Sequence, residues 1–375
     1  MSTYFYIYGL VAAGIFICFL DDSPLRRVAQ WVYFAVTLFV LATFAGMRSP
    51  SVDRDFKDYA TWFSLIQSGD APKFAWMRDP AFAAFAWIAS RLGFAYPAVA
   101  FVYALLGLVA TWRFAVAVSA RRWITLFFYL LFCQYYIVLD MTEIRAAVAI
   151  PLMALSLYYA SEGRRRKAAL IFLVGLFFHF SVIVALPFLC LLLWGARFRT
   201  RGWLYALIAM GALASVTMRS VIDLLSGLYR ISEYLNGGAE EDDLRVISWY
   251  ALAHLVVIAI PICLLWKRLN LHQRMATLAS STGLMLFLIF GWNTGLATRF
   301  LYIFDLYWLL IMMMVLDRVK REARVLYVAF LALVGFALFS KSLQYVQPYS
   351  VFHDWDVKLI PFHQALHWAQ CAQGA

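Results

Sequence analysis

The fold is decided by residues 142–194, which read TEIRAAVAIPLMALSLYYASEGRRRKAALIFLVGLFFHFSVIVALPFLCLLLW. The first apolar run, 143–160, has about the length that a helix needs to cross a bilayer, roughly 20 residues for ~30 Å of hydrocarbon. A basic turn at 164–167 separates it from a second run, 168–194, which is too long for one upright span and too short for two. The stretch therefore predicts a membrane-spanning helix followed by an irregular apolar segment.

The rest of the chain has the same apolar character. Of its 375 residues, 64% are hydrophobic and only 14% are charged, whereas soluble globular proteins are about 45–50% apolar and roughly 25% charged. This composition excludes a soluble enzyme and a disordered chain. We expect an all-α, polytopic membrane protein that forms a single integral membrane domain over residues 1–375, with about 10 full transmembrane helices. The expected full spans are 3–20, 29–46, 96–118, 123–139, 143–160, 202–218, 247–266, 275–292, 297–316 and 325–340.

The net charge of +11 indicates how the chain is oriented across the membrane. On a soluble protein it would suggest a nucleic-acid partner, but basic loops of a membrane protein mark its cytosolic side, so we expect no nucleic acid. With the N-terminus outside, most of the 32 Lys and Arg residues fall in inside loops. This orientation requires that 168–194 enters and leaves on the same side.

Residues 168–194 are therefore predicted to form a broken or re-entrant pair of short helices that turns near 179–181. A tilted single span is the alternative. Irregular backbone at membrane depth survives only where protein or a wet cavity covers it, so the segment points to a buried site.

Three segments are expected outside the membrane, on the side of the N-terminus: 47–95, 219–246 and 341–375. Within the first, the apolar periodicity of 55–68 and 81–92 predicts two short helices. They could lie on the membrane surface or dip into it.

Three arginines are predicted at outer helix ends. Arg145 and Arg299 fall in the first turns of helices whose N-termini face outside, and Arg48 ends another span. A helix N-terminus carries partial positive charge and unpaired N–H groups, and the guanidinium fork suits phosphate oxygens. We expect these arginines to bind an anionic ligand at the outer leaflet. Alternatively, each Arg snorkels or pairs with a nearby acid, such as Glu143 or Asp140.

Candidates for a general base lie in the same outer regions. His179 sits at the predicted break, where it could act as a general base or as a hydrogen-bond donor, although it could also be a packing residue. Asp55 shares a helix face with Tyr59, four residues on, but could belong to a solvated run. Glu143 could act as a base or cap the following helix.

The motifs in this order resemble the EpsG/Wzy-type polysaccharide polymerase family. Residues 142–188 are similar to its core signature, with a helix-opening Arg145, the basic turn 164–167 and Phe178-His179-Phe180-Ser181. Further similar elements are Gly46, Arg48, Asp55 and Tyr59 in GMRSPSVDRDFKDYATWF (46–63), DPAF (79–82), and Arg299 and Tyr302 in RFLYIF (299–304). The departures are Ala146 for the family's Gln, Asp79 for its Glu and Ala81 for its Gly.

The resemblance implies a membrane glycosyltransferase of the GT-C type in the bacterial inner membrane, with its active site facing the periplasm. Such an enzyme transfers a growing glycan from undecaprenyl pyrophosphate to a sugar hydroxyl of a lipid-linked oligosaccharide repeat. The product is O-antigen, capsule or exopolysaccharide. The implied partners are these lipid-linked donors and acceptors, the lipid bilayer and a chain-length regulator protein.

The resemblance also implies roles for the candidate residues. Arg48, Arg145 and Arg299 would bind the pyrophosphate, with Tyr59 and Tyr302 as further substrate-binding residues. His179, or else Asp55 or Glu143, would deprotonate or orient the acceptor hydroxyl. We expect no cofactor and no metal, since arginines at helix ends could stabilise the departing pyrophosphate without one.

Other functions share some of these features. An O-antigen ligase uses similar chemistry with a different acceptor. A transporter or flippase of lipid-linked glycan also has broken helices and midplane charges, but would show pseudo-repeat halves, which the sequence lacks. A membrane-bound O-acyltransferase also places a His among apolar helices but needs a path for acyl-CoA from the cytosol.

Overall fold

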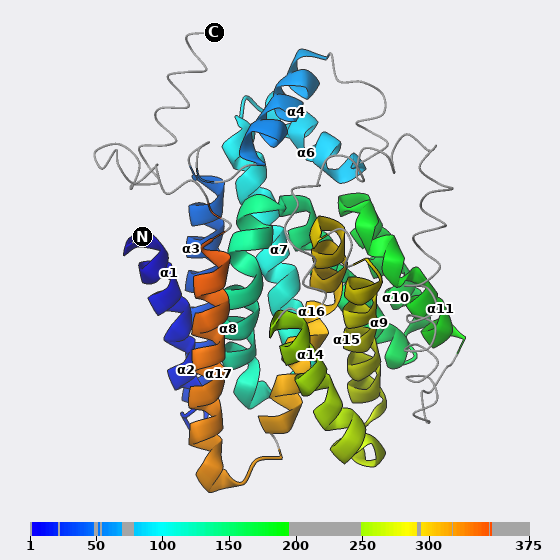
Figure 1. Ribbon diagram of the computed structural model, residues 1–375. Helices are drawn as coiled ribbons and strands as arrows, with labels where there is room; N and C mark the ends of the chain where they lie inside the picture. Colours follow the sequence, from blue (N-terminus) through cyan, green and yellow to red (C-terminus); the bar gives the residue numbers. More distant parts are fainter. Residues whose placement is uncertain are drawn as a thin grey trace. The chain divides into compact units, whose positions relative to one another are not determined.

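The computed structural model describes residues 2–21, 23–48, 52, 55–69, 79–194, 249–290, 294–316, 318–344 and 346. Every regular element in these ranges is a helix (Figure 1), as the all-α prediction requires. The chain divides into two compact units. The first comprises residues 1–160, 164–187 and 319–375, and the second comprises residues 161–163 and 188–318.

The described ranges contain six helices that are long and apolar enough to cross a membrane: Pro24–Gly46, Tyr96–Val118, Arg121–Thr142, Ile144–Ser161, Ala297–Leu316 and Glu322–Ser342. They coincide with six of the predicted spans, and the chain is a membrane protein.

The predicted number of about 10 spans is not confirmed. The runs 3–20 and 247–266 form the shorter apolar helices Thr3–Ile17 and Ala251–Cys263, and 275–292 forms a helix that is not among the six. The run 202–218 lies outside the described residues.

The first unit is built around one fully buried helix, α8 (Ile124–Tyr135). A π-helix, η2 (Tyr136–Thr142), continues α8 toward the start of α9. Figure 1 shows α17 running alongside α8. The first unit also contains α1 (Ser2–Ala12), α2 (Gly14–Ile17), α3 (Pro24–Gly46), α7 (Tyr96–Val118), α9 (Ile144–Ser161), α10 (Arg165–Phe178) and α17 (Arg321–Ser342).

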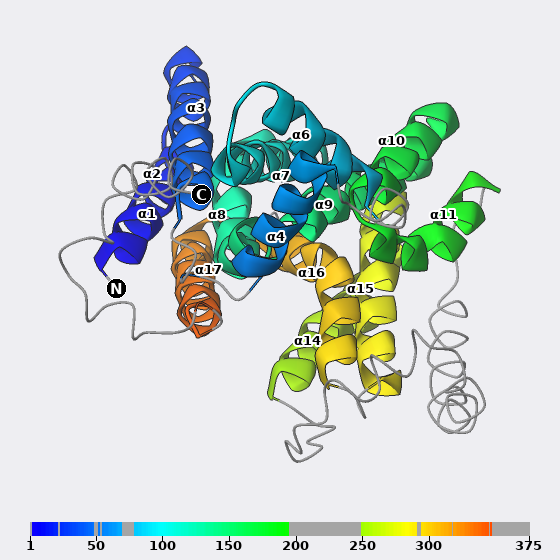
Figure 2. The ribbon, with the colours of Figure 1, turned by 90° about the horizontal axis from the view of Figure 1, so that it is seen from above.

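The two short helices predicted in the segment 47–95 are confirmed as α4 (Phe56–Ser68) and α6 (Pro80–Arg91). Gly69 ends α4 with a left-handed φ of 84°, which glycine adopts without strain. Pro80 occupies the first turn of α6, where its missing N–H costs no helical hydrogen bond. Both helices lie at the same end of α7 (Figures 1 and 2), and both contact it.

An aromatic core fixes α4 and α6 to the membrane helices. The buried residues Phe56, Tyr59, Phe63 and Ile66 recur every three or four positions along one face of α4. The Tyr59 and Tyr96 rings stack with centroids 6.4 Å apart. Residues of α4, α6, α7 and α9 join in this one buried cluster. Since α9 contributes Ile144 and Val148 to it, the core holds α4 and α6 close to the first turn of α9.

The chain breaks at His179, as predicted. Helix α10 ends at Phe178, His179 has an extended backbone with φ −158° and ψ 120°, and a 3-10 turn, η3 (Phe180–Ala185), follows. Helix α11 (Leu186–Leu193) then begins. The placement of both ends of 168–194 on one side of the membrane stays a prediction.

The second unit contains α14 (Trp249–Ile260), α15 (Leu271–Ile289) and α16 (Thr294–Leu316), which pack against one another. Asp305, a buried acid within α16, has a partner that the sequence did not reveal. His254 Nε2 lies 2.8 Å from Asp305 Oδ1, and the imidazole stacks on Trp308 with ring centroids 4.4 Å apart. This pair links α14 to α16 in the interior.

A close approach of α7 to the start of α9 depends on Gly107. A Cβ at Gly107 would lie 2.7 Å from Asp140 Oδ1 and 3.1 Å from the carbonyl oxygen of Ala147. Pro151, four residues after Ala147, has no N–H to donate to that carbonyl. Gly107 therefore covers a carbonyl that lacks this helical partner, and a larger residue would push α7 away.

We predict that Gly107→Ala destabilises the protein by about 1–3 kcal/mol, because the added methyl group overpacks the contact between the helices. Thermal unfolding of the purified protein in detergent measures this. Gly9→Ala on α1 is the matched control, since a Cβ there meets nothing within 4 Å and alanine favours the helix. Equal midpoints for Gly107→Ala and the wild type would contradict the prediction.

Candidate functional site

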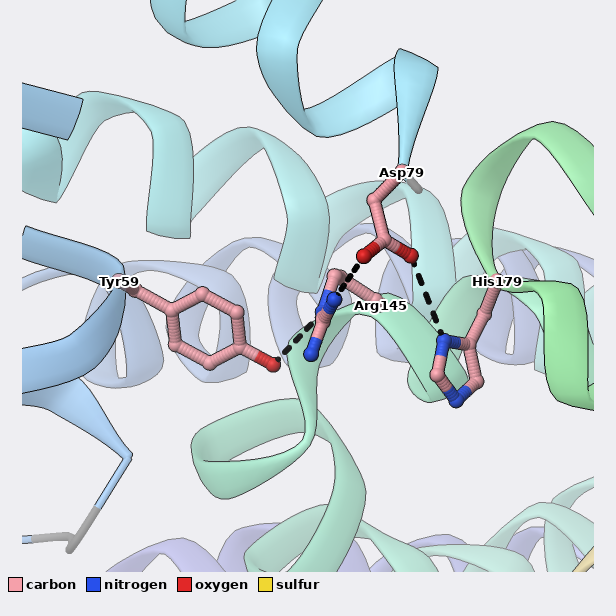
Figure 3. Close-up of polar contacts among 4 residues, drawn as sticks. All are labelled: Tyr59, Asp79, Arg145 and His179. Carbon is pink, nitrogen blue, oxygen red and sulfur yellow. Dashed lines mark hydrogen bonds and ion pairs between the residues drawn. The ribbon is translucent and has the colours of Figure 1, made fainter. Parts of the chain in front are cut away.

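Four polar side chains meet beside the first turn of α9 (Figure 3): Tyr59, Asp79, Arg145 and His179. They come from four separate parts of the first unit. Tyr59 lies on α4, Asp79 immediately precedes α6, Arg145 lies in the first turn of α9, and His179 follows α10. The aromatic core and the chain break therefore bring together residues that are up to 120 positions apart.

Arg145 is held by three kinds of contact. Its Nη1 donates a hydrogen bond to Asp79 Oδ2, and its Nε donates to the Tyr59 hydroxyl at 3.1 Å. The guanidinium also lies over the rings of Tyr59 and Trp62, with Cζ 5.1 Å and 5.2 Å from their centroids. These contacts fix the plane of the guanidinium.

Asp79 faces two basic groups at once. Its side chain is 3% exposed, so a negative charge there needs partners. One oxygen, Oδ2, accepts from Arg145. The other, Oδ1, lies 3.6 Å from His179 Nδ1, which is longer than a hydrogen bond. Asp79 thus lies between Arg145 and His179 and faces both.

His179 is the most accessible member of the cluster. Its side chain is 27% exposed, compared with 16% for Arg145 and 3% for Asp79. Its backbone N–H closes the last turn of α10 by donating to the Gly175 carbonyl at 3.0 Å. In Figure 3, Nδ1 points toward Asp79 and Nε2 points away from it. The ring is therefore oriented so that Nε2 is the nitrogen available for proton transfer.

The Tyr59 hydroxyl stays protonated at neutral pH. Burial raises its pKa to about 12, although the positive charge of Arg145 lowers it, and the nearby carboxylates of Asp55 and Glu143 raise it further. The hydroxyl oxygen accepts from Arg145 Nε, so its own proton can point to another acceptor.

The other sequence candidates of the first unit lie close to this cluster without being part of it. Arg48 is buried, donates from Nη1 to the Ala45 carbonyl at 2.7 Å and lies over the Phe56 ring. Asp55 immediately precedes α4, and its carbonyl accepts from the Tyr59 N–H. Glu143 directly precedes α9. The structure thus brings three of the sequence candidates, Tyr59, Arg145 and His179, into direct contact with Asp79 or with one another.

Arg299 and Tyr302 belong to the second unit, on α16. The Arg299 side chain is exposed and that of Tyr302 is buried. Their participation in ligand binding stays a prediction.

The acid that pairs with Arg145 is neither Glu143 nor Asp140, the neighbours that the sequence offered. Asp140 is buried in the π-helix η2, against Gly107. The partner is Asp79, 66 residues away in the chain. The feature that marks Asp79 in the sequence is its place in DPAF (79–82), directly before the proline that opens a helix. Among the described residues, no group of three or more His, Cys, Asp or Glu side chains could hold a metal ion.

The chain matches a known protein family over most of its length. The model of the EpsG family matches residues 31–352, which is most of the chain. The matched region includes all four residues of the cluster. Comparisons with curated proteins and with solved structures found no match. From the extent of the family match, the chain belongs to the EpsG family.

Proposed function

We propose that this protein is a polysaccharide polymerase of the GT-C type. It transfers a growing glycan from undecaprenyl pyrophosphate to a sugar hydroxyl of a lipid-linked repeat, at the periplasmic face of the bacterial inner membrane. The observation that carries the proposal is the cluster at the start of α9, where a fixed guanidinium and an accessible imidazole flank one buried carboxylate. Membership in the EpsG family supports a polymerase-type membrane protein.

Arg145 is suited to the leaving group. As the bond between the anomeric carbon and the phosphate oxygen breaks, negative charge develops on the lipid pyrophosphate. Donors already aimed at that position stabilise the transition state without reorganisation. Arg145 Nη2 and the protonated Tyr59 hydroxyl supply such donors, and the aromatic rings around the guanidinium keep it in place.

His179 is suited to the acceptor. Its Nε2 takes the proton of the attacking sugar hydroxyl while the hydroxyl oxygen bonds to the anomeric carbon and undecaprenyl pyrophosphate leaves with the electron pair of the broken bond. The side chain is 27% exposed, so the proton can pass to solvent afterwards. Asp55 and Glu143 are the alternative bases.

The remaining candidates are proposed as further substrate-binding residues. Arg48, Arg299 and Tyr302 would contact further phosphate or sugar groups of the two lipid-linked substrates. The reaction needs no metal or cofactor in this scheme, because protein donors stabilise the pyrophosphate. A chain-length regulator protein is a further proposed partner.

We predict that Arg145→Ala and His179→Ala each lower polymerisation of purified lipid-linked repeats at least 100-fold. The first removes donors to the pyrophosphate and the second removes the base, whose contribution is typically about 10²–10⁴-fold. Arg91→Ala, at an exposed position on α6, is the control that should keep wild-type turnover. Wild-type turnover by either test variant would refute the role of that residue.

Tyr59→Phe isolates the hydroxyl from the ring. The variant keeps the aromatic face beneath Arg145 but leaves Nε without its acceptor. A hydrogen bond to a charged group contributes about 1.5–3 kcal/mol, so we expect polymerisation to fall by about tenfold or more. Because the pKa of Tyr59 is about 12, the wild-type rate should show no ionisation of this tyrosine between pH 7 and 10. A full rate for the variant would exclude the hydroxyl from the site.

Glycan length in cells separates a polymerase from a ligase. Deletion of the gene should leave products that carry a single repeat, because repeats are made but not joined. Accumulation of free lipid-linked polymer would instead identify a ligase. Electrophoresis of the surface glycans gives the answer, and a plasmid copy of the wild-type gene should restore the long chains.

A further inference from the structure

Asp140 is a buried acid that the proposed mechanism does not use. The residue is 5% exposed and lies within Arg121–Thr142, one of the six stretches long and apolar enough to cross a membrane. Among the residues that the structure describes, its Oδ1 has no hydrogen-bond partner. Ionisable side chains inside a membrane are costly and usually functional, so a specific reason for this acid is expected.

The backbone around Asp140 is irregular. Asp140 lies in the π-helix η2, after which the Glu143 N–H donates to the Val138 carbonyl, five residues back, at 3.1 Å. Single turns of this kind inside a helix are frequent at functional sites. The elements that pack against η2 include α3, α7 and α8.

A carbonyl in need of a donor faces the same glycine as Asp140. The Ala147 carbonyl on α9 lacks the usual donor four residues on, because Pro151 has no N–H. A Cβ on Gly107 would lie 2.7 Å from Asp140 Oδ1 and 3.1 Å from the Ala147 oxygen, so both oxygens flank one point on α7. In membrane helices, neighbouring groups satisfy a carbonyl that proline has freed.

The charged groups of the surrounding elements contact other atoms. Arg145 on α9 donates to Asp79 and Tyr59, and Arg48, after α3, donates to the Ala45 carbonyl and lies over the Phe56 ring. Within η2 the Tyr136 hydroxyl donates to the Leu41 carbonyl at 2.7 Å. Helix α8 carries no charged residue, and the charged residue of α7, Arg113, is exposed.

One proton would satisfy both oxygens. An ionised carboxylate can only accept hydrogen bonds, whereas a protonated one has an O–H to donate. A buried acid without a cationic partner loses its charge in preference to staying ionised. Neutral carboxylic acids in apolar sites serve as hydrogen-bond donors in this way. The Ala147 carbonyl is an acceptor beside Asp140 that such a donor can use.

We propose that Asp140 is a neutral carboxylic acid whose O–H donates a hydrogen bond to the Ala147 carbonyl. This bond ties η2 to α9 two residues after Arg145, so Asp140 is a positioning residue for the guanidinium. The effect on polymerisation rests on the proposed function, whereas the proton and its hydrogen bond do not.

Infrared difference spectroscopy of the purified full-length protein at pH 7 tests for the proton. The spectrum of the wild type minus that of Asp140→Asn should contain the C=O stretch of a protonated carboxylic acid. Asp58→Asn, at an exposed position on α4, is the matched control and should leave this band in place. A difference spectrum without the band would overturn the proposal.

Two substitutions separate a neutral donor from a charge. The amide of Asp140→Asn can donate to the same carbonyl, so we expect polymerisation within about threefold of the wild type and an equal midpoint of thermal unfolding. Asp140→Ala leaves the carbonyl without this donor, and we expect a lower midpoint and about tenfold slower polymerisation or less. An Asp140→Asn variant as impaired as Asp140→Ala would contradict the proposal, because the charge would then be required.

A double-mutant cycle identifies the acceptor. Pro151→Ala gives position 151 an N–H that can donate to the Ala147 carbonyl, so Asp140→Ala should lower the unfolding midpoint much less in that background than in the wild type. Equal losses in both backgrounds would show that Ala147 is not the partner. Thermal unfolding and the infrared band need no substrate, so they test the proton even if the wild type fails to polymerise and the proposed function falls.

Discussion

Arg145 carries a positive charge at the start of a largely buried helix, where an acidic partner must compensate for the water that it has lost. Asp79 is that partner, and it comes from a different part of the chain. The pair can form only when α6 is docked on α7 and α4 covers both. The aromatic cluster around Tyr59, Phe82 and Tyr103 therefore does more than bury apolar surface, because it also sets the position of the carboxylate relative to the guanidinium.

The same constraint explains two local irregularities. Gly107 lets α7 lie against the start of α9, next to a carbonyl that Pro151 leaves without its usual donor. The helix after the basic turn stops at His179, so the imidazole leaves the chain at a break and not from a helix face. At His179 the regular helix is given up near the polar cluster, where irregular backbone is tolerated because protein covers it, whereas α7 and α9 continue through Gly107 and Pro151. Within the cluster, Arg145 is held by hydrogen bonds to Asp79 and Tyr59, and the His179 side chain is more exposed than that of Arg145.

Local signals in the sequence were sufficient for much of this arrangement. Apolar run length predicted six spans, periodicity predicted α4 and α6, and the awkward length of 168–194 predicted the break at His179. The pairing of Asp79 with Arg145 and that of His254 with Asp305 could not be predicted, because their partners are 66 and 51 residues apart and meet only through helix packing. The spans predicted at 3–20 and 247–266 are not confirmed, since the described residues there form the shorter apolar helices Thr3–Ile17 and Ala251–Cys263.

We propose that the cluster at the start of α9 binds the pyrophosphate of the donor lipid. The most direct test is an experimental structure of the full-length protein with undecaprenyl pyrophosphate bound. We expect phosphate oxygens within hydrogen-bond distance of the Arg145 guanidinium, with His179 facing the position of the transferred sugar. Phosphate density elsewhere, for example at the basic turn 164–167, with Arg145 still bound only to Asp79 and Tyr59, would contradict it.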